Sequence, residues 1–221
     1  MTWARSPQEE ALLRRSLPLL ADVGLPIAIA DRGNNPEFTT FLEQLPRTSV
    51  TVAAGLVAQV QASVAMAAAS EPPFILYIES DKAFFFEHRL CDFLERALEH
   101  ADAGVVLASR SVASFETFPT TQRYTESVIN ELCARLLGVP GDYSYGPFLL
   151  NRTLAIHVGT LAQGLGWGWR HAAFRAAHRA GLSVIHLVGE YPCPPDAQEE
   201  DEDEVVHRIR QLSQNIGGLI A

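Results

Sequence analysis

The feature that most constrains this sequence is a series of short, unbroken apolar segments separated by stretches of helix length. The unbroken apolar segments occupy residues 26–30, 74–78 and 104–108, and a further strand is expected at residues 49–53, where Ser49 and Thr51 alternate with valines. Stretches with helical spacing or with helix start and stop signals occupy residues 8–23, 37–45, 55–69 and 84–100. Strands that are apolar at every position are covered on both faces, and strands that alternate with helices form layered sheets. The sequence therefore predicts an α/β fold with a mostly parallel sheet flanked by helices.

The pattern changes after Arg110, where the regular alternation ends. We expect helices at residues 121–137, 153–165, 171–180 and 208–216, a loop with an apolar segment at 143–151 and a late strand at 182–188. The sequence contains no internal repeat and no linker-like stretch. We therefore expect one compact domain over residues 1–221, in which the half formed by residues 111–221 packs on the half formed by residues 1–110.

Composition excludes several classes of protein. Hydrophobic residues make up 48% and charged residues 19% of the 221 residues, which excludes a disordered chain. The formal net charge is −9, so the surface as a whole does not attract nucleic acid or anionic lipid. Residues 48–70 carry no charge, but Gly55, Gln59 and Gln61 interrupt this stretch. A buried strand followed by a helix of small residues explains it better than a stable membrane span.

The cysteines indicate a reducing compartment. Cys91, Cys133 and Cys193 are far apart, odd in number and without CxxC spacing. This usage argues against a disulfide framework and against a structural zinc site. We therefore expect a cytoplasmic protein.

Acidic residues follow two of the expected strands. Asp31 comes directly after residues 26–30, and Glu79 and Asp81 come directly after residues 74–78. In open α/β sheets, ligands bind beyond the carboxyl ends of the strands, and carboxylates there can hold Mg²⁺ or Mn²⁺. If residues 74–78 form a central strand, Asp31 and Asp81 lie on one edge of the sheet. The alternative is structural: Asp31 as a turn residue, and residues 79–81 as the cap of the following helix.

The order of these elements and motifs resembles the nucleotide-sugar-binding half of the GT-A glycosyltransferases. The resemblance is to the family 2 type or to the glucosyl- and mannosyl-3-phosphoglycerate synthases, whose fold is Rossmann-like. It rests on a strand ending in Asp31, a glycine-led helix at Gly55 and the acid-x-acid motif formed by Glu79 and Asp81. It implies that Asp81 binds the Mg²⁺ or Mn²⁺ that bridges the nucleotide diphosphate. The nucleotide-sugar site that the resemblance implies consists of Asp31, Arg32, Gly55, Glu79 and Lys82.

The second half resembles the acceptor side of the same family. Residues 142–152 resemble its acidic-turn, Gly, apolar, Arg segment, and residues 167–170 resemble its late Trp/Gly segment. The catalytic residues that we expect are Asp142, Arg123 and Glu126. The acceptor-binding residues that we expect are Tyr145, Gly146, Trp167, Trp169 and Arg170. His186 is a candidate second metal ligand.

For several of these residues a structural alternative stays open. Arg123 and Glu126 are three residues apart on one helix and can form an ion pair with each other. The two tryptophans can be core residues, and His186 lies in an apolar segment where a buried histidine is ordinary. The six consecutive acids at residues 199–204 are explained better by a solvated loop leading into a helix than by a metal site.

The sequence also departs from the family pattern. The usual first strand is absent or reduced to residues 1–4, and no acidic pair follows Arg170 to supply the base of an inverting member. We therefore expect a glycosyltransferase that transfers sugar from a nucleotide-diphosphate sugar to a small-molecule or lipid acceptor, or an inactive binding or regulatory protein on the same fold. A nucleotidyltransferase ranks last, because a Gly-rich basic first loop is missing. A homodimer is compatible with the sequence.

Overall fold

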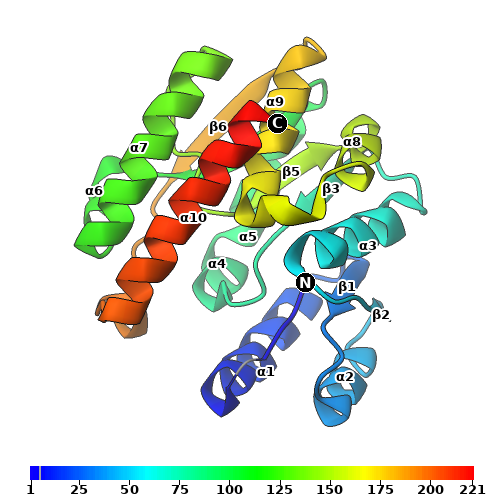
Figure 1. The fold of residues 1–221 in the computed structure, drawn as a ribbon. Coiled ribbons are helices and arrows are strands. Elements are labelled where there is room, and N and C mark those ends of the chain that lie inside the picture. Colours follow the sequence, from blue (N-terminus) through cyan, green and yellow to red (C-terminus); the bar gives the residue numbers. More distant parts are fainter. Residues whose placement is uncertain (5) are drawn as a thin grey trace.

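In a computed structural model, which describes residues 1–4 and 6–221, the strands form two sheets (Figure 1). The larger sheet has the order β3-β5-β4-β6 and the smaller one the order β1-β2. The strands of the larger sheet are β3 (Phe74–Tyr77), β4 (Val105–Arg110), β5 (Phe148–Asn151) and β6 (Val184–Gly189). The strands of the smaller sheet are β1 (Ile27–Asp31) and β2 (Thr48–Val52).

The expectation of an α/β fold is confirmed, but that of one mostly parallel sheet is wrong. β1 runs parallel to β2 and β4 runs parallel to β6, whereas β5 runs antiparallel to both β3 and β4. β3 forms an end of the larger sheet and is not a central strand. The sequence around β5 does not reveal the direction of this strand, because a strand buried on both faces is apolar whether it runs parallel or antiparallel to its neighbours.

One face of the larger sheet is covered mainly by helices from the second half of the chain. A core that includes Tyr77, Leu107 and Phe148 from the strands packs against Phe174 and Trp169 of these helices. The elements contributing to this core are α3 (Leu56–Ala68), α7 (Thr120–Leu137), η2 (Arg152–Leu154), α8 (Ala155–Gly159), η3 (Gln163–Gly168), α9 (Trp169–Arg179) and α10 (Glu202–Ile220).

The other face is covered by short helices. Phe85, Leu90 and Phe93 pack against strand residues that include Val106 and Leu149. The short elements of this half are α4 (Ala83–His88), α5 (Leu90–Ala97), η1 (Leu98–His100), α6 (Val112–Glu116) and η4 (Pro195–Ala197). The single helix expected at residues 84–100 is therefore interrupted, and the break falls where the backbone leaves the helical region at φ −132°.

The smaller sheet carries α1 (Pro7–Ala21) and α2 (Pro36–Glu43). Both helices begin with a proline, preceded by a residue whose side chain accepts a backbone N–H: Ser6 for α1 and Asn35 for α2. Leu17, Ile29 and Phe38 pack together between these helices and β1. α3 contacts both β1 and β3 and so links the two sheets.

A cavity of about 580 Å³ lies between β1 and β3. Its lining includes backbone segments 27–29 and 74–78 together with parts of α1 and α3. The N-terminal residues lie beside β1 and form one parallel bridge with it, between Thr2 and Asp31. In this bridge Thr2 N donates to the Ala30 carbonyl, and Arg32 N donates to the Thr2 carbonyl. The expectation of a first strand reduced to residues 1–4 is confirmed.

Two later expectations need correction. Residues 153–165 do not form one helix, because the chain passes through η2, α8 and η3, with a non-helical Gly166 at φ 53°. α10 is longer than expected, because Asp201 caps it and the acids that follow occupy its first turn. Within the described residues, no helix is long and apolar enough to cross a membrane.

Candidate functional site

The turn after β1 is built around the carboxylate of Asp31, which is buried. Oδ1 accepts the Thr2 hydroxyl at 2.7 Å, and Oδ2 accepts Gly33 N at 2.8 Å and the Thr39 hydroxyl at 3.2 Å. These bonds make Asp31 a turn-forming residue that ties the N-terminal segment to α2. A direct contact of Asp31 with the nucleotide sugar, which the resemblance implied, conflicts with this burial and with these occupied oxygens.

Arg32 and Gly55 lie on the surface near the ends of β1 and β2. The Arg32 guanidinium stacks on Trp3, with its central carbon 3.9 Å from the ring centroid. Gly55 caps α3 at φ 99°, a conformation that other residues rarely adopt, and it has open space around it. The glycine-led start of the helix at residue 55 is thus confirmed.

The acid after β3 is held by an arginine. Arg170 Nη1 lies 2.9 Å from Glu79 Oε1, and the side chains are only 4% and 14% exposed. Burial raises the pKa of Glu79, although Arg170 and Lys82 oppose the shift. Sequence reasoning assigned Arg170 to acceptor binding, whereas the structure places it against the acid-x-acid motif.

Gly146 fits closely against the same carboxylate. Its φ is 124°, and a Cβ at this position would come 1.9 Å from Glu79 Oε2. Only glycine leaves room for Glu79 in this orientation. Gly146 was expected on the acceptor side, but it shapes the end of β3.

Asp81 and Lys82 complete the turn after β3. Asp81 is exposed, and Lys82 Nζ lies 5.4 Å from the centroid of the Tyr145 ring. Within the described chain, α4 has Lys82 at its N-cap and no capping bond from a side chain. The structure therefore does not support the alternative in which residues 79–81 serve as a helix cap.

The N-terminal residues join the two acidic strand ends. The Thr2 hydroxyl contacts Asp31, and the Ser80 hydroxyl donates to the Met1 carbonyl at 3.2 Å. Burial lowers the pKa of the Met1 amine to about 6, although Glu79 and Asp31 oppose the shift. The acids after β1 and β3 therefore meet at one edge of the molecule, as the strand-end rule predicts.

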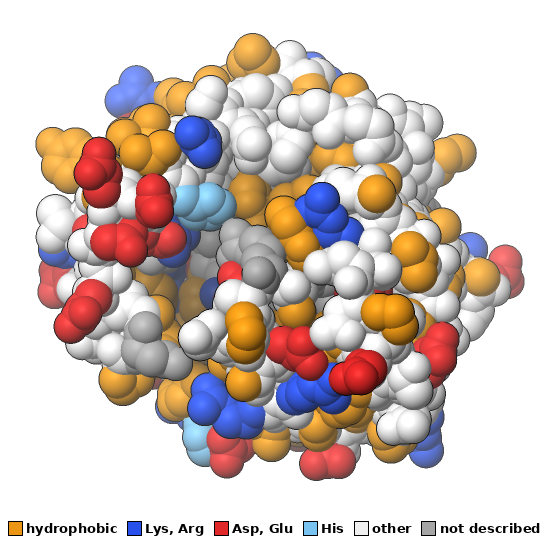
Figure 2. All heavy atoms as spheres, turned by 60° about the horizontal axis from the view of Figure 1, so that its bottom comes forward, with side chains coloured by type: hydrophobic (Ala, Val, Ile, Leu, Met, Phe, Trp, Pro, Cys, Tyr) orange, Lys and Arg blue, Asp and Glu red, His pale blue; other side chains and the backbone are white. Residues whose placement is uncertain are grey.

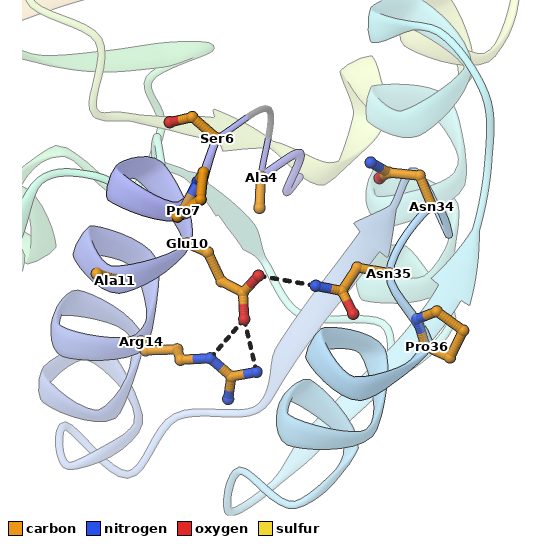
Figure 3. A pocket seen from close by; sticks show the side chains of 9 residues that line it. All are labelled: Ala4, Ser6, Pro7, Glu10, Ala11, Arg14, Asn34, Asn35 and Pro36. Carbon is orange, nitrogen blue, oxygen red and sulfur yellow. Dashed lines mark hydrogen bonds and ion pairs between the residues drawn. The ribbon is translucent and has the colours of Figure 1, made fainter.

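A hollow of about 550 Å³ opens beside the turn after β1 (Figure 3). It lies between the N-terminal turns of α1 and α2. Glu10 faces into it and accepts a hydrogen bond from Asn35 Nδ2 at 2.7 Å, and Arg14 pairs with the same carboxylate at 2.8 Å. The residues that line it are Ala4, Ser6, Pro7, Glu10, Ala11, Arg14, Asn34, Asn35 and Pro36.

Two of the expected catalytic acids belong to a buried ion network. Arg110 Nε lies 2.6 Å from Asp142 Oδ2, and Arg110 Nη2 lies 2.5 Å from Glu126 Oε2. Burial works against the ionised form of Asp142, but Arg110 outweighs it and the pKa of Asp142 is lowered. Asp142 also accepts Asn130 Nδ2 and Ser144 N. The catalytic assignment of Asp142 and Glu126 is wrong for this geometry, because both carboxylates are buried and fully engaged.

The alternative in which Arg123 pairs with Glu126 is wrong, because Glu126 pairs with Arg110. Arg123 instead lies in the first turns of α7, where Nη2 approaches the Thr120 hydroxyl at 3.5 Å. Glu200 binds the same helix end, accepting Thr121 N at 3.0 Å and Gln122 N at 3.1 Å. Sequence reasoning missed Glu200, since a run of acids gives no signal for which member makes a specific contact.

The acids at residues 199–204 otherwise behave as expected. Asp201 caps α10 through Glu204 N at 2.8 Å, and Glu204 pairs with Arg208. Figure 2, which brings the bottom of Figure 1 forward, shows acidic side chains gathered on the side where α10 begins. The interpretation as a solvated helix start is confirmed, with the added role of Glu200.

The aromatic residues of the expected acceptor site divide into two groups. Trp169 is fully buried and packs edge-on against Tyr77, with ring centroids 4.6 Å apart, so its acceptor role is wrong. Tyr145 is also buried and stacks on Tyr191 at 4.8 Å. Trp167 is partly exposed and lies 5.4 Å from the Arg170 guanidinium carbon.

His186 does not meet Asp81. It lies on β6, separated from β3 by two strands, which corresponds to about 14 Å at usual strand spacing. Its Nδ1 is 2.6 Å from the Ser109 hydroxyl, and burial lowers the pKa of His186 to about 4. The core alternative for His186 is thus the correct one.

The residues at the end of β3 do not fit a divalent metal ion. Mg²⁺ and Mn²⁺ bind through several oxygen ligands, usually charged ones. In the part of the chain that the structure describes, no three His, Cys, Asp or Glu residues gather into a possible metal site. Glu79 is already neutralised by Arg170, which leaves Asp81 as the free carboxylate of the motif.

The fold is similar, in divergent form, to that of a GT-A glycosyltransferase. A mycobacterial protein of known structure matches 96% of this chain and 71% of its own, with a TM-score of 0.62 and 13% identity. Glucosyl-3-phosphoglycerate synthase from Mycobacterium tuberculosis is also similar in fold. Its complex with phosphoglyceric acid gives a TM-score of 0.61 and 14% identity, over 97% of this chain and 76% of that one.

The same enzyme in complex with Mn²⁺ and uridine-diphosphate-glucose gives a TM-score of 0.59 and 14% identity, over 96% of this chain and 75% of that one. At these identities the likeness establishes the fold alone. No protein-family model matches the sequence, and no curated protein matches it either.

Proposed function

We propose that this chain binds a nucleotide-diphosphate sugar at the edge where β1 and β3 end, and transfers the sugar to an acceptor. The observation that carries the proposal is the meeting of both acidic strand ends at Met1 and Thr2, on a fold shared with an enzyme solved with uridine-diphosphate-glucose. Ligands of open α/β sheets bind at such edges. In this proposal residues 1–110 hold the donor and residues 111–221 hold the acceptor.

The hollow beside the turn after β1 is the proposed nucleoside site. Its size of about 550 Å³ lies within the usual range of small-molecule sites. Glu10 and Asn35 supply polar groups inside it. The diphosphate extends from there toward Lys82, whose positive charge stabilises the diphosphate as it leaves the sugar, while Arg170 holds Glu79 in place.

The N-terminal end of α7 is the proposed acceptor site for an anionic group. Arg123 and the backbone N–H groups of Thr121 and Gln122 favour a carboxylate or phosphate there. Glu200 occupies these N–H groups through both of its oxygens. An anionic acceptor, such as the phosphoglyceric acid found with the structural neighbour, must therefore displace Glu200.

A second candidate function is binding without transfer. It is favoured by the state of the carboxylates proposed for the site: Glu79 is held by Arg170, and Glu126 and Asp142 are held by Arg110. Transfer would have to rely on Asp81, which is exposed and remains available as a base. If the protein does not transfer the sugar, it acts as a nucleotide-sugar sensor or regulatory partner.

Isothermal titration calorimetry with uridine-diphosphate-glucose tests the shared part of both functions. We expect Ala11→Phe, which fills the hollow, to abolish binding, while Gln8→Phe on the same exposed side of α1 leaves it unchanged. Absence of binding by the wild-type protein to a panel of nucleotide sugars contradicts the proposal. Release of uridine diphosphate in the presence of 3-phosphoglycerate distinguishes transfer from binding alone.

A further inference from the structure

The acid-x-acid motif of this chain already contains a cation. Arg170 arrives from the first turn of α9, 91 residues later in the sequence than Glu79, and its Nη1 lies 2.9 Å from the Glu79 carboxylate. Both side chains are largely shielded from water, with 4% and 14% exposure. The Coulombic attraction within a pair in this setting is stronger than on the surface, and removing either partner leaves a buried charge uncompensated.

The surroundings fix this pair in place. Gly146 packs directly on the second oxygen of Glu79, which leaves that oxygen buried on the side of β5. The Trp167 ring lies 5.4 Å from the guanidinium carbon of Arg170. Among the atoms that the structure describes, Glu79 Oε2 and Arg170 Nε are buried without a hydrogen-bond partner, so the hydrogen bond that joins the two side chains runs from Arg170 Nη1 to Glu79 Oε1.

The charges around the motif also disfavour a metal ion. Glu79 and Asp81 carry two negative charges, and Arg170 and Lys82 carry two positive ones. Because Glu79 and Arg170 neutralise each other, a divalent ion at Asp81 finds one free carboxylate with the Lys82 ammonium close by in the chain. An anionic diphosphate finds the partly exposed ammonium of Lys82 at the start of α4 and a Glu79 whose charge Arg170 neutralises.

We infer that Arg170 and Lys82 replace the divalent metal of the acid-x-acid motif, so that this site binds a nucleotide diphosphate without Mg²⁺ or Mn²⁺. The inference rests on the proposed function for its ligand. Arg170 is a positioning residue that neutralises and orients Glu79. Lys82 contacts the diphosphate, for which a lysine ammonium is an ordinary partner.

Calorimetry with uridine diphosphate in EDTA, together with Mn²⁺ binding measured by electron paramagnetic resonance, tests this inference. We expect the wild-type protein to bind uridine diphosphate equally with EDTA and with Mn²⁺. The wild-type protein should also lack a Mn²⁺ site with a dissociation constant below about 1 mM, which is the weak end of the range for specific divalent-cation sites in proteins. Lys82→Gln should weaken uridine diphosphate binding about tenfold or more, and Lys82→Arg should largely retain it. Arg179→Gln, an exposed change on the same helix as Arg170, is the control and should have no effect.

Arg170→Gln gives the sharpest contrast. It frees Glu79 beside Asp81, so binding of uridine diphosphate should fall in EDTA and be restored by Mn²⁺, with a new Mn²⁺ signal. The double variant with Glu79→Gln and Arg170→Gln removes both charges together, and it replaces the single variant in the test if Arg170→Gln fails to fold. It should bind uridine diphosphate without gaining a Mn²⁺ site.

The outcomes separate this inference from the proposed function. Wild-type binding that is lost in EDTA and restored by Mn²⁺, or a stoichiometric Mn²⁺ site in the wild-type protein, overturns the inference and leaves the proposed function standing. Absence of nucleotide binding under both conditions, with no Mn²⁺ site, overturns the proposed function and with it the assignment of the ligand.

Discussion

At the scale of single residues, the end of β3 depends on a glycine. Gly146 has φ 124°, and a Cβ there would come 1.9 Å from Glu79 Oε2. A side chain at this position is both strained in its backbone and in collision with a buried carboxylate that Arg170 holds. The Glu79–Arg170 pair therefore exists only because residue 146 is glycine.

We expect Gly146→Ala to lower the free energy of unfolding by about 3 kcal/mol, because strain and the displaced ion pair add. The matched control is Gly138→Ala, at φ 74° with open space around it, which should cost about 1 kcal/mol from backbone strain alone. Urea denaturation measures both. Equal losses for the two variants would show that Glu79 does not resist the added methyl group.

His186 makes the stability of the protein depend on pH. Burial lowers the pKa of His186 to about 4, below the ordinary value of 6.5. The unfolded chain therefore takes up this proton first, and the free energy of unfolding falls as the pH drops from about 6.5 to about 4. The contribution of His186 is fully present above pH 6.5.

The variant His186→Asn removes this titration and keeps a polar group near Ser109. We expect the difference in unfolding free energy between wild-type and variant protein to shrink as the pH falls from 7 to 4. Urea denaturation at a series of pH values provides the measurement. A difference that stays constant with pH would mean that His186 is protonated equally in both states.

At the scale of elements, the N-terminal end of α7 is capped from a distant segment. Pro119 is the N-cap, and in the described chain no capping bond comes from its side chain. Glu200 takes over this role by accepting Thr121 N and Gln122 N at 3.0 and 3.1 Å. The start of α7 and the start of α10 are therefore coupled through one carboxylate.

We expect Glu200→Ala to destabilise the protein by about 1 kcal/mol, as the loss of a cap usually does. Glu199→Ala, in the same run of acids, is the control and should change stability little. The same substitution at Glu200 should strengthen binding of 3-phosphoglycerate, since it removes a competing anion. Weaker binding would indicate that Glu200 belongs to the acceptor site as a ligand contact.

The elements also show what the sequence can and cannot predict. β1, β3 and β4 follow from unbroken apolar segments, and the importance of the acids after β1 and β3 follows from the rule that ligands bind at strand ends. The direction of β5 has no signature in the sequence. The Glu79–Arg170 and Arg110–Asp142 pairs join residues far apart in the sequence, so the roles of Arg170 and Asp142 emerge only from tertiary packing.

At the scale of the whole molecule, the two sheets do not join. A cavity of about 580 Å³ separates β1 from β3, and parts of α1 and α3 complete its lining. This cavity opens to the surface and is lined mainly by apolar side chains, which therefore lack packing partners on one side. The region between the sheets is therefore where added apolar volume can increase stability.

We expect Ala67→Leu on α3, which points added carbon atoms at this cavity, to raise the free energy of unfolding by about 1–2 kcal/mol. Ala65→Leu on the exposed side of the same helix is the control and should change stability by only about 0.2 kcal/mol. Denaturant titration compares them. A destabilised Ala67→Leu variant would show that the cavity walls cannot accept the larger side chain.

The central claim is that a nucleotide-diphosphate sugar binds where β1 and β3 end. It is tested most directly by two-dimensional ¹H–¹⁵N nuclear magnetic resonance during a titration with uridine-diphosphate-glucose in EDTA. The account predicts saturable shifts of the backbone signals of Asn35, Lys82 and Gly146 and of the side-chain Nε–H signal of Arg170, with small changes on the surface of β6. Shifts confined to other regions, or an absence of shifts both in EDTA and with Mn²⁺, would contradict it.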